Sequence, residues 1–196
     1  MTERARPTLR GYRRADGRLG ARNHILILPS VVCADQTAML IGAEPGTVAV
    51  VHQHGCGQVG DDVEHTERAF LGFATNPNVG ATLVVSLGCE TIQGRRLANR
   101  IAERGQRLEF AGIQLMGGTF NTVDRGKEAV GRLRELLATD HQVEADLADL
   151  VLGIATDVPT ELAHELADRA IGEGAAVVIA LPGAGAQAWG ARATVA

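Results

Sequence analysis

The sequence predicts an α/β protein: a three-layer, Rossmann-like parallel sheet of about six strands with helices on both faces. Two observations predict this class. Short apolar runs rich in β-branched residues, which are typical of buried strands, recur along the chain, and stretches with helical periodicity lie between them. Because parallel strands need a crossover between them, this alternation indicates right-handed βαβ units.

Each expected element is bounded by a turn or capping signal. The expected strands are 25–31, 48–51, 82–87, 108–115, 150–154 and 176–181, and the expected helices are 34–41, 61–74, 94–103, 121–137 and 159–171. Gly42 and the Glu44-Pro45-Gly46 turn end the first helix, and Asn76-Pro77 ends the second. Acidic residues in the first turn of helix 61–74 complement its dipole.

The length of 196 residues suits one compact domain. We expect it to cover residues 21–182. Residues 1–20, with six arginines, are expected to form an N-terminal arm, either extended or an edge hairpin around Asp16-Gly17, and residues 183–196 a C-terminal tail.

The composition argues against several classes of partner. Nineteen Lys and Arg residues against 23 Asp and Glu give a formal net charge of −4 without a block of one sign, so no nucleic acid is expected. No apolar run approaches the length of a membrane span, and the basic start lacks the apolar segment of a signal peptide. We therefore expect a cytoplasmic protein that does not bind a membrane. Three cysteines without framework spacing indicate reduced thiols or metal ligands.

Cysteine and histidine gather where strands end. The sequence His52-Gln53-His54-Gly55-Cys56-Gly57 follows strand 48–51, while Cys33 and Cys89 follow two other strands. The carboxyl ends of parallel strands line the crevice in which ligands bind, so the three thiols are expected to share one pocket. No dinucleotide fingerprint or phosphate loop follows any strand. The absence of a CxxC pair also disfavours a thiol-redox protein.

Three thiolates favour an iron–sulfur cluster with one iron left open for substrate. The alternative for each cysteine is a small buried hydrophobic residue.

Several segments together resemble a known family, the altronate/galactarate dehydratases and their sulfolactate sulfo-lyase relatives, specifically the domain called the second. The matching segments are GYRRADGRLGARNHILILPSVVC, HQHGCG, LGFATNPNVGATLVVSLGCE and Gly117-Gly118-Thr119. The resemblance implies a lyase that removes water or sulfite from a small polyhydroxylated acid to give a 2-keto acid. It also implies dependence on iron, so the predicted cofactor is iron, either as Fe²⁺ or as the iron–sulfur cluster that the three thiolates favour.

The residue types and the resemblance together predict the residues of the site. They are Cys33, Cys56 and Cys89 for the metal, His52 and Glu90 for catalysis, and Arg22, Asn23, Gln53, Gly55, Gly57 and Gln93 for substrate binding. His52 is preferred to His54 because it directly follows the strand and matches the family. Each of these residues also has a purely structural interpretation. His52 could be a hydrogen-bonded packing residue and Glu90 an ordinary carboxylate at the start of a helix. Arg22 could be a surface arginine.

The sequence departs from the family in two places. Relatives continue into a further region that opens with a cysteine, paired glycines, a serine and an aspartate. At the corresponding place this chain has residues 154–159 (Ile-Ala-Thr-Asp-Val-Pro). In addition, Asn76 stands where relatives usually carry a histidine before proline. Two functions are therefore carried forward. One is a lyase subunit or short form, in a homo- or hetero-oligomer with a partner subunit that supplies the missing region. The other is a non-catalytic module that either binds a small carboxylic acid or has a regulatory role.

Overall fold

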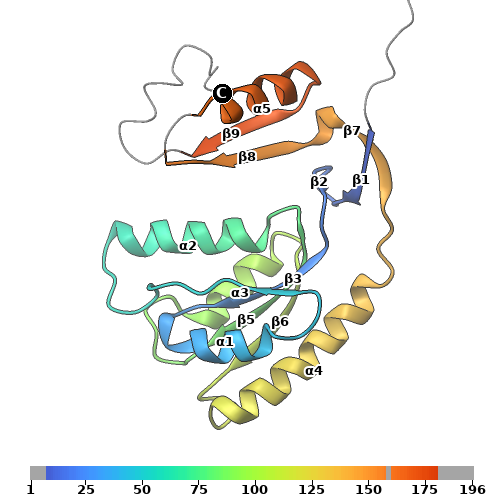
Figure 1. Cartoon of the computed structure of the whole chain (residues 1–196). Helices are drawn as coiled ribbons and strands as arrows, with labels where there is room; N and C mark the ends of the chain where they lie inside the picture. The colour runs from blue at the N-terminus through green and yellow to red at the C-terminus, as the bar shows by residue number, and fades with distance from the viewer. Residues whose placement is uncertain (1–7, 158–159, 181–196) are drawn as a thin grey trace, which may run out of the picture. The chain divides into compact units, whose positions relative to one another are not determined.

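The computed structural model describes residues 8–157 and 160–180, and Figure 1 labels their elements. The chain divides into two compact units, Tyr12–Gln142 and a second unit that combines Met1–Gly11 with Val143–Ala196. We call these the sheet unit and the βαβ unit. The domain expected over 21–182 takes in parts of both, and the tail expected over 183–196 lies outside the described residues.

A four-stranded parallel sheet forms the centre of the sheet unit. Its strands are β3 (His24–Pro29), β4 (Thr47–Ala49), β5 (Val79–Ser86) and β6 (Arg107–Gly112), and their order is β4-β3-β5-β6. The register pairs Leu26 with Thr82 and Leu83 with Glu109. Helices α1 (Asp35–Ile41), α2 (Asp61–Ala74) and α3 (Gly94–Ala102) connect the strands, and α4 (Thr119–Leu137) follows β6.

Helices cover both faces of this sheet because successive side chains along a strand alternate between faces. Ile25 and Ile27 belong to a buried cluster that includes Ile41 of α1 and residues of α4. Leu26 and Leu28 belong to a second buried cluster, with residues of α2 and α3. The strands are therefore apolar on both sides, as a sheet buried between helix layers requires. The predicted α/β class with a parallel sheet is confirmed.

The prediction of about six strands in one sheet is wrong. The last two expected strands correspond to β8 (Val151–Ala155) and β9 (Ala176–Ala180), which pair in parallel only with each other in the βαβ unit. Helix α5 (Glu161–Gly172) connects them. Both strands alternate between exposed and partly buried residues, unlike β5, which is buried over nearly its whole length. Local apolar runs predict strands, but they do not specify which sheet each strand joins.

The N-terminal segment forms a hairpin, one of its two predicted conformations. Strand β1 (Thr8–Arg13) pairs antiparallel with β2 (Leu19–Gly20), and Gly17 takes a φ of +86° in the turn. Within the βαβ unit, the first half of β1 also pairs with β7 (Val143–Asp146), a strand that was not among those predicted. Short 3₁₀ turns occupy Val32–Ala34 and Leu147–Asp149. Across the described residues, every helix falls short of the length or the apolar content that a bilayer crossing needs.

The core of the sheet unit can be tested at Leu83, which is fully buried in the central strand β5. Leu83→Ala is expected to lower the free energy of unfolding by about 2–5 kcal/mol, because the buried contacts are lost and a cavity remains. Urea denaturation measures this change. Leu115→Ala, at a leucine that is 72% exposed, is the matched control. Equal effects of the two substitutions would contradict the described core.

Candidate active site

Three turns meet at the carboxyl edge of the parallel sheet. They follow β4, β3 and β5, which are neighbours in the strand order. The backbone around Gly55 joins them, because the amide of Val32 donates to the carbonyl of His54 at 2.9 Å and the amide of Thr91 donates to that of Gly55 at 3.0 Å. Gly55 has a φ of +92°, and a Cβ there would lie 2.1 Å from the carbonyl oxygen of Ser30. Only glycine permits this approach.

The cysteines occupy these turns without forming a ligand set. Cys33, Cys56 and Cys89 are all free and exposed. Among the residues that the structure describes, no group of three or more His, Cys, Asp or Glu side chains is placed to hold a metal ion. The turns therefore come together, while the described side chains as arranged here form no ligand set, and iron at the three cysteines stays a prediction. We derive no chemical step through a metal.

The imidazole of His52 is held at both nitrogens. Nε2 lies 2.8 Å from the carbonyl oxygen of Pro29, and the amide of His54 donates to Nδ1 at 3.1 Å. Since a carbonyl only accepts and an amide N–H only donates, Nε2 carries the proton and Nδ1 accepts. The ring also packs against Phe70, with 4.5 Å between centroids. In this geometry His52 orients the turn and has no unoccupied nitrogen with which to take a proton from a substrate.

Glu90 is buried, with 3% of its surface exposed. Its Oε1 accepts from the hydroxyl of Ser30 at 3.0 Å and from the amide of Gly94 at 3.2 Å, and its Oε2 accepts from the amide of Gly88. One carboxyl group thus joins the end of β3, the turn after β5 and the start of α3. This places Glu90 as a positioning residue for the site.

A cavity of about 740 Å³ lies beside the joined turns, between the end of β4 and helix α2. We call it the histidine pocket, since His52, His54 and His65 line it. His54 is exposed, and its ring lies 6.1 Å from that of His52. Within the described part of the chain, the ring nitrogens of His54 make no hydrogen bond. His54 therefore presents an available imidazole, as does the exposed His65 across the pocket, whose ring makes no hydrogen bond among the described residues.

Sequence reasoning passed over His54, His65 and Gln58 as site residues. Gln58 accepts from the amide of Gly55 at 2.9 Å and donates to Thr66 at 2.8 Å, so it connects the glycine turn to α2. A signal was present in the helical spacing. The lining residues of α2 are Asp62, His65, Thr66, Ala69, Phe70 and Phe73. Their separations of three and four positions put them on one face of a helix.

Asp35 is a further polar residue at the joined turns that the sequence did not single out. Its Oδ2 accepts from the amide of His52 at 3.1 Å. Its Oδ1 is buried without a hydrogen-bond partner. Burial raises the pKa of Asp35, and the hydrogen bond from His52 opposes that shift.

The predicted substrate-binding residues fall at two different edges of the sheet. Arg22 and Asn23 precede β3, whereas the joined turns follow it, and six extended residues separate the two by about 20 Å. The backbone amide of Arg22 donates to Asn78 at 3.0 Å, and Asn23 donates to Asp140 at 3.0 Å. The structure therefore does not bring Arg22 and Asn23 to the site.

The remaining predicted residues lie in the joined turns. Gly55 is at their centre, while Gln53 and Gly57 are exposed in the same turn. Gly57 has a φ of +70°, which favours glycine. Gln93 precedes α3, and its side-chain amide donates to the carbonyl of Glu90.

A parallel sheet with polar turns and a cavity at its carboxyl edge defines an α/β domain of the kind that binds small molecules. Comparison with known families is more specific. Residues 11–138 match the family described as D-galactarate dehydratase/Altronate hydrolase, second domain. The chain belongs to this family, as the resemblance in its sequence predicted.

Curated relatives share about 30% of their residues with this chain. Altronate dehydratase of Bacillus subtilis (strain 168) is 29% identical over 159 residues, and altronate dehydratase of Escherichia coli (strain K12) is 32% identical over 148 residues. The (2R)-sulfolactate sulfo-lyase subunit beta of Chromohalobacter salexigens is 30% identical over 144 residues. These matches cover 75%, 64% and 73% of this chain but 31%, 30% and 36% of the relatives. The chain thus spans about a third of their length.

The role of Glu90 can be tested with Glu90→Gln. Glutamine replaces one carboxylate oxygen by an NH₂ group, which cannot accept a hydrogen bond. At least one of the bonds from Ser30, Gly88 and Gly94 is therefore lost. We expect the free energy of unfolding to fall by about 1–3 kcal/mol. Urea denaturation measures the loss, and Glu103→Gln, at an exposed glutamate just beyond α3, is the control. Identical stability of Glu90→Gln and the native chain would contradict the positioning role.

Asp35 gives a prediction with a definite pH dependence. Because its pKa is raised in the folded chain, Asp35 binds a proton more tightly there than when unfolded, and its contribution to stability falls as the pH rises through that window. Asp35→Asn removes this titration but keeps an oxygen that accepts from His52. The stability of the variant relative to the native chain should therefore rise as the pH increases from about 4, the ordinary value of an aspartate, through the raised pKa of Asp35. Thermal unfolding across this range measures it, and a constant or falling difference would contradict the assignment.

Proposed function

We propose that this chain is a subunit or short form of a hydratase/dehydratase-type lyase that acts on a small sugar acid or hydroxy acid and yields a 2-keto acid. Family membership supports the reaction class. The observation that carries the proposal for this chain is the imidazole of His54 in a cavity at the carboxyl edge of the sheet, where neither ring nitrogen bonds to any residue that the structure describes. A base held at the rim of a small-molecule pocket is what proton abstraction requires.

The proposed reaction needs a proton acceptor and a route for hydroxide to leave. The base takes the proton from the carbon next to the carboxylate, the C–H electron pair forms a C=C bond, and the C–O bond to the next carbon breaks. The leaving hydroxide takes up the abstracted proton from the protonated base and departs as water, and the enol that remains tautomerises to the 2-keto acid. We assign proton abstraction to His54, in place of His52, whose two nitrogens are occupied. Glu90 and His52 then position the turn that carries the base.

Iron dependence remains a hypothesis for Cys33, Cys56 and Cys89. Thiolates are the usual ligands of iron–sulfur clusters, and the three turns that carry these cysteines already meet. Purification without oxygen, followed by measurement of iron and acid-labile sulfide, tests the hypothesis. Protein that holds neither iron nor sulfide after anaerobic reconstitution would exclude both the cluster and bound Fe²⁺.

A partner polypeptide is part of this proposal. The chain spans about a third of its curated relatives, and one of those relatives is itself named as a subunit. We propose that this chain acts in a homo- or hetero-oligomer, as the subunit name of the sulfolactate sulfo-lyase relative suggests. Co-purification of the tagged chain from its native host, followed by mass spectrometry, identifies such a partner.

A second function competes with catalysis. The histidine pocket at the carboxyl edge of the sheet could equally hold a small acid that is bound and not converted. The two functions are separated by incubating the chain with sugar acids and with sulfolactate, with and without Fe²⁺ and the co-purified partner. Formation of 2-keto acid supports the lyase. Saturable binding without product under every condition supports the binding module.

The assigned base can be tested once turnover is measured. His54→Gln should lower turnover at least about 100-fold, because glutamine cannot take the proton. His24→Gln, at the opposite end of β3, should leave turnover unchanged, and circular dichroism checks that both variants fold. Full turnover in His54→Gln would exclude His54 as the base.

A further inference from the structure

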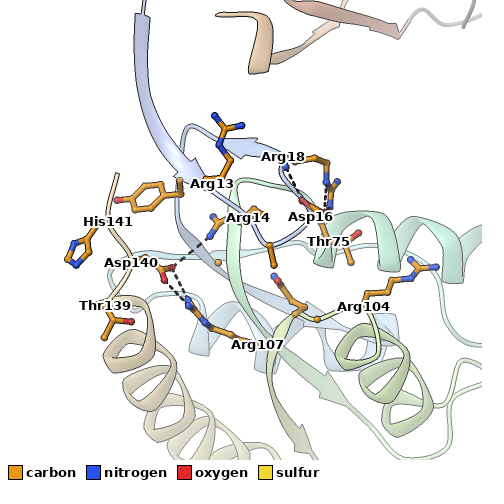
Figure 2. Close-up of a pocket in the computed structure, with 15 residues that line it drawn as sticks. Arg13, Arg14, Asp16, Arg18, Thr75, Arg104, Arg107, Thr139, Asp140 and His141 are labelled. Carbon is orange, nitrogen blue, oxygen red and sulfur yellow. Dashed lines mark hydrogen bonds and ion pairs between the residues drawn. The ribbon is translucent and has the colours of Figure 1, made fainter. Parts of the chain in front are cut away.

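A second cavity opens at the amino edge of the parallel sheet, the edge opposite the joined turns. It has a volume of about 350 Å³ and is lined by the β1–β2 hairpin, the starts of β5 and β6, and the residues after α4. Figure 2 shows these side chains. Five of the lining residues are Arg13, Arg14, Arg18, Arg104 and Arg107, so we call this cavity the arginine pocket.

Among the described lining residues, two carboxylates face Arg14, Arg18, Arg104 and Arg107, and each carboxylate is already paired. Asp140 accepts two bonds of 2.7 Å from Arg107 and lies 3.8 Å from Arg14, as Figure 2 shows, while Asp16 pairs with Arg18 at 2.6 Å. The guanidinium of Arg104 makes no hydrogen bond or ion pair within the described part of the chain. The pocket therefore has an excess of positive charge that its own carboxylates do not neutralise.

Arg14 is the cation that this excess affects most. Its side chain is only 16% exposed. Burial and the neighbouring charge of Arg107 lower its pKa, and Asp140 offsets only part of that effect. Two further donors of Arg14 are fixed by the carbonyls of Pro77 and Arg22, at 2.7 and 3.1 Å, so the side chain cannot swing out to water. An added anion beside Arg14 would relieve this unfavourable environment.

The other lining residues select the kind of anion. They include Thr75, Gln106 and Thr139 but no leucine, isoleucine, valine, methionine or phenylalanine. Tyr12 and Ala15 add some apolar surface, but most of the wall offers hydrogen bonds and charge. A volume of about 350 Å³ suits a small molecule, at the lower end of the range for ligand sites.

We propose that the arginine pocket binds a small polyanion that carries carboxylate or phosphate groups, because arginine N–H groups match both kinds of oxygen acceptor. This site lies at the opposite edge of the sheet from the histidine pocket and does not depend on the lyase proposal. Its ligand is an effector or a second small acid, recognised by charge and hydrogen bonding alone.

Isothermal titration of the full chain with inorganic phosphate and, separately, with malonate tests the proposal, with ionic strength held constant by sodium chloride. The native chain should bind at least one of the two anions saturably. Binding of phosphate alone identifies a phosphate-bearing ligand, binding of malonate alone identifies a carboxylate, and binding of both identifies a site for either oxyanion.

Arg104→Glu reverses the charge of an exposed rim residue without breaking a described contact, and it should weaken binding about tenfold. Arg96→Glu makes the same change at an exposed position of α3 outside the pocket and should alter affinity less than about twofold. Absence of saturable binding, unchanged affinity in Arg104→Glu, or equal weakening in both variants would overturn the proposal.

Discussion

The carboxyl edge of the sheet depends on one buried carboxyl group. Glu90 accepts hydrogen bonds from Ser30, Gly88 and Gly94, which belong to three different segments. The glycines make the approach possible, because a Cβ at Gly94 would lie 2.3 Å from the Cβ of Ser86. A buried acceptor left without these donors would cost free energy, so the group and its donors specify one arrangement of the turns. Backbone contacts therefore hold the turns beside the histidine pocket in place. The side chains that face the pocket are positioned by these turns.

Local patterns in the sequence predicted the elements well. Helix α2 has the predicted bounds, and α1, α3 and α4 begin or end within a few residues of theirs, because their apolar spacing and end signals are local. Strand β7 was not predicted because Glu144 and Asp146 alternate with small or apolar residues, a pattern that also describes a polar linker. The pairing of β8 with β9 alone was not predictable either, since sheet membership depends on contacts between distant segments.

The candidate site shows the same limit at the level of side chains. The rule that parallel strands end at one edge predicted which turns meet. It did not predict where the thiols face, because the backbone of an irregular turn sets that direction residue by residue. His52 and His54 illustrate the difference. The sequence favours the histidine next to the strand, but that proximity is what brings its ring to the carbonyl of Pro29 and occupies it. The histidine farther from the strand stays available.

The two edges of the sheet use charge in different ways. At the amino edge, Asp140 accepts from Asn23 and Arg107 and lies near Arg14, so one carboxylate joins the starts of β3 and β6, the hairpin and the end of α4. Arg14 and Arg18 of the N-terminal segment are therefore structural, since both donate to backbone carbonyls near the end of α2. Asp140 can neutralise only one of its two arginine neighbours. The hydrogen bonds from Arg107 lower the pKa of Asp140. The fold thus requires cations that it does not fully pair, and a pocket lined by such cations is suited to hold an anion from solution.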